Sequence, residues 1–408
     1  MKTYFACLLI SVCTTPLFAT VNVKSFGAAG DGYTNDTAAL NDAFQVGCAT
    51  SQPVYIPTGV YLIDPLTVLN GCGTTFYGDG GAHSVLRFNS KSNLNPNIVQ
   101  SLWSFAAGTG KTLTINDLGL QGMHGKLAGL AIDHYNTVNL HTLTITNFGT
   151  AGYAQGHGQP YDGVYLTNSQ NANLSYIAST GNERYGIELQ AVHNSTVSHS
   201  TMSGNGSIGG VSEENYAGAL DGPKVAQWLN NTFANNGGGG IDVETAASLP
   251  AVQGILQGNV VTNCGNNNWG SGWGLTLGLN AFGVIQNNEV DNFAASAAST
   301  AYSSAIVYGA NGGTIQILNN TVKGTRSYGI LGNDGLYPTT ISGNTVNANG
   351  TGIFIYDSPA IQLSNNTVTN NVGAGISVYW SDGSTISGNH YSSNNPDLMI
   401  NGTQVADQ

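Results

Sequence analysis

Residues 352–355 read GIFI and residues 375–378 read GISV, and strands of this kind, each led by a small residue, recur along the chain. The other copies are GVYL at Gly163, GIEL at Gly186, GVSE at Gly210, GIDV at Gly240, GLTL at Gly274, AIVY at Ala305 and GILG at Gly329. Successive copies lie 23, 24, 30, 34, 31, 24, 23 and 23 residues apart. A unit of this length cannot bury its own apolar face, so neighbouring units must stack and share one core.

A second motif, rich in asparagine, lies between these strands. Its copies are NNTF at Asn230, NNEV at Asn287, NNTV at Asn319, GNTV at Gly343, NNTV at Asn365 and GNHY at Gly388. Short apolar strands, asparagine-rich turns and no helical period predict an all-β fold, a single-stranded right-handed parallel β-helix solenoid. A β-sandwich with coincidental spacing is the alternative. A solenoid grows without a boundary, so we expect one domain over residues 20–408, with regular repeats at 129–395.

The ends and the charge narrow the functional classes. Residues 1–19 carry Lys2, an apolar run too short to span a bilayer and a plausible cleavage site, which predicts a signal peptide and a secreted protein, extracellular or periplasmic. A net charge of −12 with ten basic residues argues against nucleic acid and acidic membranes as partners. The sequence favours a Cys48–Cys72 disulfide and two free thiols equally, and Cys264 is expected to be buried.

Residues 20–63 have the most specific local sequence and predict an N-terminal cap. Glycines at 30 and 32 permit a turn, Asn35 or Asp36 caps a helix from about Thr37 to Val46, and Ala38, Leu40 and Phe44 form its apolar stripe. Such a helix covers the open end of a solenoid.

This segment resembles the N-terminal cap of the pectate-lyase-like β-helix superfamily, which includes polygalacturonases, rhamnogalacturonases, mannuronan epimerases and tailspike depolymerases. The matching residues are Phe26-Gly27-Ala28, Gly30-Asp31-Gly32 and Asn35-Asp36-Thr37, then Pro57, Gly59 and Tyr61. The resemblance implies the fold and a polysaccharide or oligosaccharide substrate. Because the motif is shared among members with different reactions, Asp31 and Asp36 are expected to be structural.

Aligned repeats place equivalent side chains in columns. Alternate residues of a strand share a face, so residues two and four after each leading residue are predicted to point outward. The two columns read Tyr165, Glu188, Ser212, Asp242, Thr276, Val307, Leu331, Phe354, Ser377 and Thr167, Gln190, Glu214, Glu244, Gly278, Gly309, Asn333, Tyr356, Tyr379.

Four carboxylates, Glu188, Glu214, Asp242 and Glu244, thereby fall on three consecutive rungs. Close like charges destabilise a fold and raise one another's pKa, so the cluster predicts an acid/base or cation site. If the Gly209-Gly210 pair shifts its rung, Glu213 replaces Glu214. The alternative is a set of ordinary exposed residues on a hydrophilic sheet.

The units that begin at Gly210, Gly240 and Gly274 are longer than the others, and the extra residues are expected to form loops beside a cleft. Three tryptophans in or near these loops are candidates for stacking on sugar rings: Trp228, Trp269 and Trp273. Further substrate-binding candidates are Tyr165, Arg184 and Lys224, and an aromatic strip of Phe354, Tyr356, Tyr379 and Trp380 suggests outer subsites.

Two carboxyl groups, one protonated and one ionised, are what glycoside hydrolysis requires. We expect a hydrolase in which Asp242 is the general acid, Glu214 and Glu244 share the activation of water, and Glu188 positions substrate. The spacing of Asp242 and Glu244 lies near the lower edge of that expected for inversion, which the resemblance also implies. No cofactor and no transition-metal site are assigned, and the protein is expected to be a monomer or a trimer.

Two other classes stay open. In a polysaccharide lyase or uronate epimerase the acids would hold Ca²⁺, with Arg184, Tyr185 or Lys224 abstracting the proton. Mannuronan epimerases carry a histidine in a Tyr-Gly-x-Asp-Pro-His-Glu run, which is missing from the closest stretch, residues 185–190. A non-enzymatic adhesin or carbohydrate-binding solenoid would explain the aromatic strip but not the stacked acids.

Overall fold

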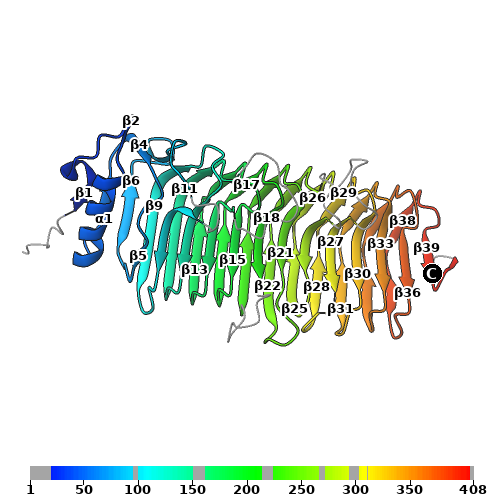
Figure 1. The fold of residues 1–408 in the computed structure, drawn as a ribbon. Coiled ribbons are helices and arrows are strands. Elements are labelled where there is room, and N and C mark those ends of the chain that lie inside the picture. Colours follow the sequence, from blue (N-terminus) through cyan, green and yellow to red (C-terminus); the bar gives the residue numbers. More distant parts are fainter. Residues whose placement is uncertain are drawn as a thin grey trace, which may run out of the picture.

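The computed structural model of the chain describes residues 20–94, 100–149, 161–213, 224–265, 272–293, 303–309 and 311–404. Strands of successive coils lie side by side along one axis, with helix α1 (Thr37–Thr50) at one end and β39 (Leu398–Ile400) at the other (Figure 1). Coil after coil pairs in parallel, which confirms the predicted all-β, right-handed parallel β-helix. The predicted signal peptide, residues 1–19, lies outside the described residues.

In the described part of the chain, one 14-stranded sheet, called sheet B here, contains the glycine-led strands of the repeat. Its strands are β5 (Leu69–Asn70), β8 (Ser101–Ala106), β10 (Ala128–Asp133), β12 (Val164–Thr167), β15 (Ile187–Gln190), β18 (Ile208–Glu213), β21 (Gly239–Val243), β24 (Trp273–Leu277), β27 (Ser304–Gly309), β30 (Tyr328–Asn333), β33 (Thr351–Tyr356), β36 (Ile376–Tyr379), β39 and β40 (Thr403–Gln404). The β5–β8 pair precedes residue 129, so the coils begin before the predicted regular repeats.

The other strands of the described residues form the 26-stranded sheet A, which is two parallel ladders joined by two long strands. The long strands are β9 (Thr112–Gln121) and β11 (Thr137–Thr146). Each bends in its middle, where Asp117 and Thr142 have φ of 56° and 52°, and each pairs in both ladders. Every later coil therefore has three faces: one strand in sheet B and two in sheet A.

The first ladder and the N-terminal strands of sheet A are short. Their bounds are β1 (Val21–Asn22), β2 (Asp31–Asn35), β3 (Val54–Ile56), β4 (Gly59–Ile63), β6 (Thr75–Gly78), β7 (Ser84–Phe88), β13 (Asn171–Ser175), β16 (Asn194–Ser198), β19 (Val225–Leu229), β22 (Val252–Gln257), β25 (Ala281–Gln286), β28 (Ile315–Leu318), β31 (Thr339–Ser342), β34 (Ile361–Ser364) and β37 (Thr385–Ser387).

The second ladder begins with β2, β4 and β7, which lead to the C-terminal halves of β9 and β11. From β13 onward each of its strands follows a first-ladder strand after a short corner. These strands are β14 (Ala178–Thr180), β17 (Thr201–Ser203), β20 (Thr232–Ala234), β23 (Val260–Thr262), β26 (Glu289–Asp291), β29 (Thr321–Lys323), β32 (Thr345–Asn347), β35 (Thr367–Thr369) and β38 (His390–Ser392). A continuous column of buried aliphatic and aromatic side chains fills the space between the three faces.

The leading glycine of each repeat is explained by close packing inside the coil. A Cβ on Gly352 would lie 2.4 Å from the carbonyl oxygen of Gly375 and 2.6 Å from a methyl of Val368. A Cβ on Gly186 would likewise lie 2.6 Å from the carbonyl oxygen of Gly209. No side chain fits at such distances. A glycine at the leading position therefore allows the next coil to approach closely.

The asparagine motif forms a buried ladder at the corner between the two strands of sheet A. Asn344 Oδ1 accepts the backbone N–H of Asn320 at 2.9 Å, and Asn344 Nδ2 donates to Asn366 Oδ1 at 2.9 Å. The preceding asparagine of each pair, such as Asn319 and Asn365, has φ near 55°, a conformation that asparagine tolerates better than most residues. The paired asparagines therefore serve the turn and the ladder separately.

Helix α1 caps the N-terminal end, and it is longer than predicted because its apolar face continues to Gly47. Leu40, Ala43 and Phe44 are buried, whereas Ala38 is exposed, so the predicted stripe was wrong at that position. The Asp36 carboxylate accepts the N–H groups of Ala29 and Gly30 at 2.6 and 3.0 Å instead of capping the helix.

Asn35 Oδ1 accepts the N–H of Thr37 at 3.1 Å, so this asparagine provides the side-chain bond at the start of the helix. Asp31 accepts the N–H groups of Tyr33 and Thr34, each at 2.8 Å. Both aspartates of the cap motif thus have the structural role that the sequence predicts.

The Cys48–Cys72 disulfide forms and ties α1 to the first coils, and Cys264 is a buried free thiol. Asn236 Nδ2 contacts Cys264 Sγ at 3.8 Å, so the thiol occupies the next place in a short ladder of Asn182, Asn205 and Asn236. In the described residues no helix is long and apolar enough to cross a membrane.

Candidate active site

The register of the two predicted columns of sheet B is confirmed except on one rung, but several of their side chains, such as Glu188, Thr276 and Ser377, are buried and do not face solvent as predicted. Tyr165 pairs with Glu188, Asp242 with Thr276, and the column continues through Val307, Leu331, Phe354 and Ser377. On β18, however, Val211 and not Ser212 pairs with both Glu188 and Asp242. The predicted position of Ser212 was therefore wrong by one residue.

Trp228 gives the physical reason for this shift. Its indole is fully buried, Nε1 donates to Ser212 Oγ at 3.1 Å, and a Cβ on Gly210 would lie 2.3 Å from the ring. Gly210 leaves room for the indole, and Ser212 must point inward to accept its hydrogen bond. Trp228 is thus a core residue of β19, and its prediction as a sugar-stacking residue was wrong.

The same shift places Glu213 beside Gln190 in the register of sheet B. Glu213 therefore takes the column position predicted for Glu214, which was the alternative that the Gly209-Gly210 pair suggested. Glu214 itself lies outside the described residues, and its assignment stays a prediction.

Glu188 is bound in a buried ion-pair network. Arg184 donates to Asp162 through Nε at 2.9 Å and through one terminal nitrogen at 2.6 Å, and that nitrogen also contacts Glu188. The Asp162 and Glu188 side chains are 0% and 2% exposed, and that of Arg184 is 21% exposed. Burial alone would lower the pKa of Arg184, but the charges of Asp162 and Glu188 raise it above its ordinary value.

This network limits the chemistry that Arg184 can perform. Its guanidinium also lies over the Tyr185 ring, 4.4 Å from the centroid. A cation held protonated by two carboxylates cannot act as a base, and its Nε and one terminal nitrogen are directed at Asp162 and Glu188. Asp162, which the sequence analysis missed, could have been found as the acid directly before a leading glycine.

Asp242 and Glu244 lie next to each other on one face of β21 and the residue that follows it. Asp242 is 7% exposed, and Glu244 is half-buried. Two residues of extended strand separate them by about 6.6 Å along the backbone. Asp242 is two rungs from Glu188, which corresponds to about 9.6 Å.

A groove of about 770 Å³ begins at Glu244 and continues over the outer face of β24, β27, β30 and β33. Its floor is made of short or absent side chains, including Thr276, Gly278, Val307 and Gly309. The rest of its lining is Trp273, Leu279, Tyr308, Tyr328, Leu331, Asn333, Asp334, Phe354 and Tyr356. Glu244 therefore lies at one end of a cleft whose lining includes several aromatic residues, and Asp242 lies beside it on β21.

Several predicted substrate-binding residues meet at this groove. Trp273, Phe354 and Tyr356 line it, and the ring of Tyr379 lies 5.8 Å from that of Phe354. Tyr328, which the sequence analysis missed, lies 5.0 Å from Phe354. It occupies the strand position before the leading glycine, outside the two predicted columns, in register with Trp273 through Ser304.

Other predicted residues lie elsewhere. Tyr165 is on β12, beyond Glu188, and its hydroxyl donates to Gln190 Oε1 at 2.7 Å. Lys224 is exposed at the start of β19 in sheet A, where its backbone N–H donates to His193. Trp269 lies outside the described residues.

One further acid extends the second column towards the N terminus. Asp133 on β10 pairs with Thr167 and accepts hydrogen bonds from the Thr167 hydroxyl and Asn168 Nδ2 at 2.6 and 2.9 Å. Burial alone would raise the pKa of Asp133, but these bonds and His134 lower it overall. Its hydrogen bonds join β10 to the next rung, which gives this carboxylate a structural role.

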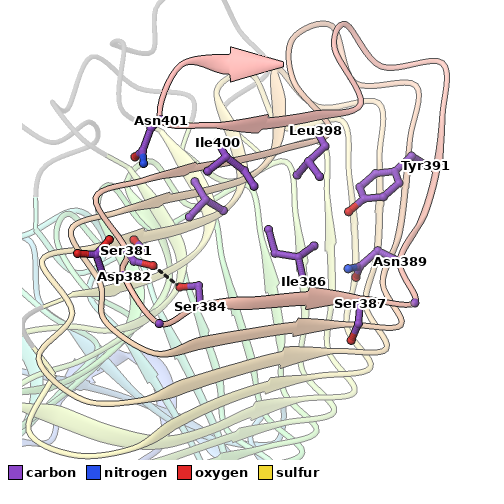
Figure 2. Close-up of a pocket in the computed structure, with 13 residues that line it drawn as sticks. Ser381, Asp382, Ser384, Ile386, Ser387, Asn389, Tyr391, Leu398, Ile400 and Asn401 are labelled. Carbon is purple, nitrogen blue, oxygen red and sulfur yellow. Dashed lines mark hydrogen bonds between the residues drawn. The ribbon is translucent and has the colours of Figure 1, made fainter. Parts of the chain in front are cut away.

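Among the described residues, no three His, Cys, Asp or Glu side chains are placed to hold a metal ion. A second cavity, of about 340 Å³, lies at the C-terminal end of the solenoid (Figure 2). Ile386, Leu398 and Ile400 point into it from the last coils. Among the described residues it lies at the end of the apolar core, far along the axis from the acids (Figure 1).

Comparisons with known proteins agree with this architecture. A right-handed β-helix region matches residues 220–391, and the family described as "Rhamnogalacturonase A/epimerase, pectate lyase-like" matches residues 20–273. A LysM effector of Penicillium expansum, described as non-secreted, is 48% identical over 52 residues, which are 12% of this chain and 4% of that protein. The chain thus spans a small part of the length of this curated relative.

Two solved structures share the fold over nearly the whole chain. The A-module of the mannuronan C-5 epimerase AlgE6 of Azotobacter vinelandii is 16% identical with a TM-score of 0.62, covering 95% of this chain and 99% of that module. The catalytic unit of a GH87 α-1,3-glucanase of Streptomyces thermodiastaticus is 14% identical with a TM-score of 0.52, covering 93% and 67%. The family match includes more than half of the chain, so the protein belongs to the rhamnogalacturonase A/epimerase, pectate-lyase-like family.

Proposed function

We propose that the protein is a secreted inverting glycoside hydrolase that cleaves a polysaccharide at the acid-bearing end of the sheet B groove. The observation that carries the proposal is the adjacency of Asp242 and Glu244 at the end of a cleft large enough for a sugar chain. Family membership supports a carbohydrate substrate, since the family name includes a rhamnogalacturonase and an epimerase.

The environments of the two acids suggest their roles. Burial disfavours the charged form of a carboxyl group, so the 7% exposed Asp242 is suited to hold a proton and act as the general acid. Glu244, which is more exposed and lines the groove, can contact a water molecule there and is assigned as the base. Inverting enzymes hold their two carboxyl groups about 6.5–9.5 Å apart to leave room for a water molecule, and the backbone spacing of about 6.6 Å between Asp242 and Glu244 is compatible with such a pair.

In this mechanism Asp242 donates its proton to the glycosidic oxygen while the bond from that oxygen to the anomeric carbon breaks. Glu244 accepts a proton from a water molecule that attacks the same carbon from the opposite face, so the configuration inverts. Glu188 supports the site through its ion pair with Arg184 and orients the strand beside it. No metal ion or cofactor takes part in the proposed steps.

A lyase or epimerase is the second candidate, and it is favoured by the overlap with an epimerase module across its whole length. The Arg184 network argues against it in the form predicted, because Arg184 stays protonated between Asp162 and Glu188. Of the other bases predicted for that reaction, Tyr185 would remain, because Lys224 lies at sheet A.

The test is a panel of neutral and uronic polysaccharides assayed together for reducing ends and for the ultraviolet absorbance of unsaturated uronates. We expect reducing ends without absorbance, released as the inverted anomer by NMR, and a loss of at least about 100-fold in Asp242→Asn and Glu244→Gln. Glu289→Gln, on sheet A, is the matched control and should be fully active. Absorbance that a chelator abolishes would establish the lyase instead.

A further inference from the structure

We propose that the sheet B groove binds an uncharged glycan chain, so that the substrate of this site is a neutral polysaccharide and not a polyuronate. The proposal rests on the proposed function in one respect: it assumes that the glycan bound in the groove is the substrate on which the acids act. It adds the substrate class, which neither the family nor the fold fixes.

The aromatic lining suits the C–H faces of pyranose rings. Trp273, Tyr328, Phe354 and Tyr356 are half-buried, so their rings are held by packing while part of each surface remains open to the groove. The tilted contact between Tyr328 and Phe354, at 5.0 Å, fixes both rings before any ligand binds. Rigid aromatic side chains provide apolar contact area at a low cost in conformational entropy.

The floor leaves space for rings above the sheet. A Cβ on Gly309 would lie 2.8 Å from the carbonyl oxygen of Asn333, and one on Gly278 would lie 3.1 Å from Glu244 Oε2. Absence of a side chain at both positions hollows the second outward column on two successive rungs. The stretch from β24 to β33 measures roughly 14 Å at the spacing of neighbouring strands, which exceeds the length of a single sugar ring.

The charge of the groove opposes an anionic chain. Its charged lining residues are Glu244 and Asp334, and none of the described residues that line it is Lys, Arg or His. A polyuronate carries a carboxylate on each residue, and like charges in a partly desolvated cleft repel one another. The polar groups that remain, such as the Asn333 amide, are suited to hydroxyl groups.

Basic side chains near the site are directed elsewhere. Arg184 is enclosed by Asp162 and Glu188, and Lys323 contacts Glu289 and Asp291 on sheet A at 3.5 and 3.2 Å. Arg326 is exposed two residues before Tyr328 but does not line the groove. It is therefore the residue to test for recognition of a uronate carboxylate.

The experiment is affinity electrophoresis of the mature protein in gels that contain one polysaccharide each, followed by calorimetry with oligosaccharides of the best ligand. The neutral probes are β-1,3-glucan, β-1,4-glucan, α-1,3-glucan, galactan, mannan and xylan, and the acidic probes are polygalacturonate and alginate. The variants are Phe354→Ala, Tyr328→Ala and Arg326→Ala. Tyr176→Ala, an exposed aromatic residue outside the groove, is the matched control. Circular dichroism checks that each variant is folded.

We expect retardation in at least one neutral gel and none in the acidic gels. Phe354→Ala and Tyr328→Ala should each raise Kd by about tenfold, as expected for loss of one ring contact, while Arg326→Ala and Tyr176→Ala bind as the wild type does. Four results would each overturn the proposal. They are retardation only in the acidic gels, loss of retardation in Arg326→Ala, unchanged binding in both aromatic variants, and no retardation in any neutral gel.

Failure of the hydrolase proposal gives a different pattern. Neutral-glycan binding that depends on Phe354, without release of reducing ends, would overturn the hydrolase and leave the groove proposal intact. Cleavage of a polyuronate that depends on Asp242 would overturn the neutral-glycan proposal and leave the hydrolase proposal intact.

Discussion

Arg184 shows how one side chain can hold two coils together at the edge of the candidate site. It joins Asp162, directly before one leading glycine, to Glu188 on the following rung. Both carboxylates are almost completely buried, so each depends on the guanidinium for charge compensation. The network therefore matters more for the stability of these rungs than for contact with a ligand.

Arg184→Gln should lower the free energy of unfolding by about 3–5 kcal/mol, because it leaves two buried carboxylates without their cation. Urea denaturation followed by circular dichroism measures the change. Lys323→Gln removes an exposed ion pair on sheet A and should have a much smaller effect. Equal effects of the two substitutions would show that Asp162 and Glu188 are not desolvated in solution.

Cys264 provides a second prediction for a single residue. Burial raises the pKa of its thiol to about 11, although hydrogen bonds from Asn236 act in the opposite direction. The nucleophilic form is the thiolate, so a native protein prepared from residue 20 onward should not react with a thiol reagent at pH 8, and one thiol should react after denaturation in urea. Rapid labelling of the native protein would mean that this part of the core opens readily.

At the scale of single strands, packing between coils explains which residues recur in the repeat. The leading glycine is required by the approach of the next coil, and the second asparagine of each pair by the ladder that it joins. Neither requirement depends on function. A repeat defined by these residues is for that reason a reliable indicator of the fold and a poor indicator of the reaction.

Gly352→Ala should destabilise the solenoid by several kcal/mol, since the added methyl group overlaps the carbonyl of Gly375 and the side chain of Val368. Thermal denaturation measures the loss. Ala305→Gly is the matched control, because the wild-type chain already accommodates alanine at this leading position, and it should cost about 1 kcal/mol. A Gly352→Ala variant as stable as the control would refute the packing explanation.

The whole molecule has two unlike ends. The N-terminal end is closed by α1, the Cys48–Cys72 disulfide and a set of hydrogen-bonded aspartates, whereas the described C-terminal end leaves apolar side chains facing a cavity (Figures 1 and 2). Asp31 and Asp79 have lowered pKa values because their carboxylates accept hydrogen bonds from Thr34 and Thr58. For Asp64, burial raises the pKa but bonds from Ser92, Asn35 and Asn89 lower it overall.

The pH dependence of stability follows from these directions. A carboxyl group with a lowered folded-state pKa contributes its stabilisation fully above its unfolded value, near pH 4, and loses it as the pH falls through the folded value. The melting temperature should therefore drop as the pH is lowered from 5 towards 2. Calorimetry on the wild type and on Asp64→Asn measures this, and the variant should show the smaller decrease. Identical decreases would remove Asp64 from the explanation.

The sequence by itself determined the fold, the cap and the outward columns. These follow from local rules, namely the spacing of leading glycines, the paired asparagines and strand alternation, which every coil repeats. The same alternation placed Asp242 and Glu244 on one face of β21, and the alternative register position of Glu213 was among its predictions.

Only the tertiary structure decided which side chains from different coils come into contact. Trp228 is buried because its indole fills space under Gly210, and this packing also moved Ser212 inward and shifted the register. The pairing of Arg184 with Asp162 and Glu188, and the groove that joins Trp273 to Tyr328 and Phe354, bring together side chains from different coils. Such contacts depend on the volumes and charges of neighbours in space, which a pattern along one strand does not specify.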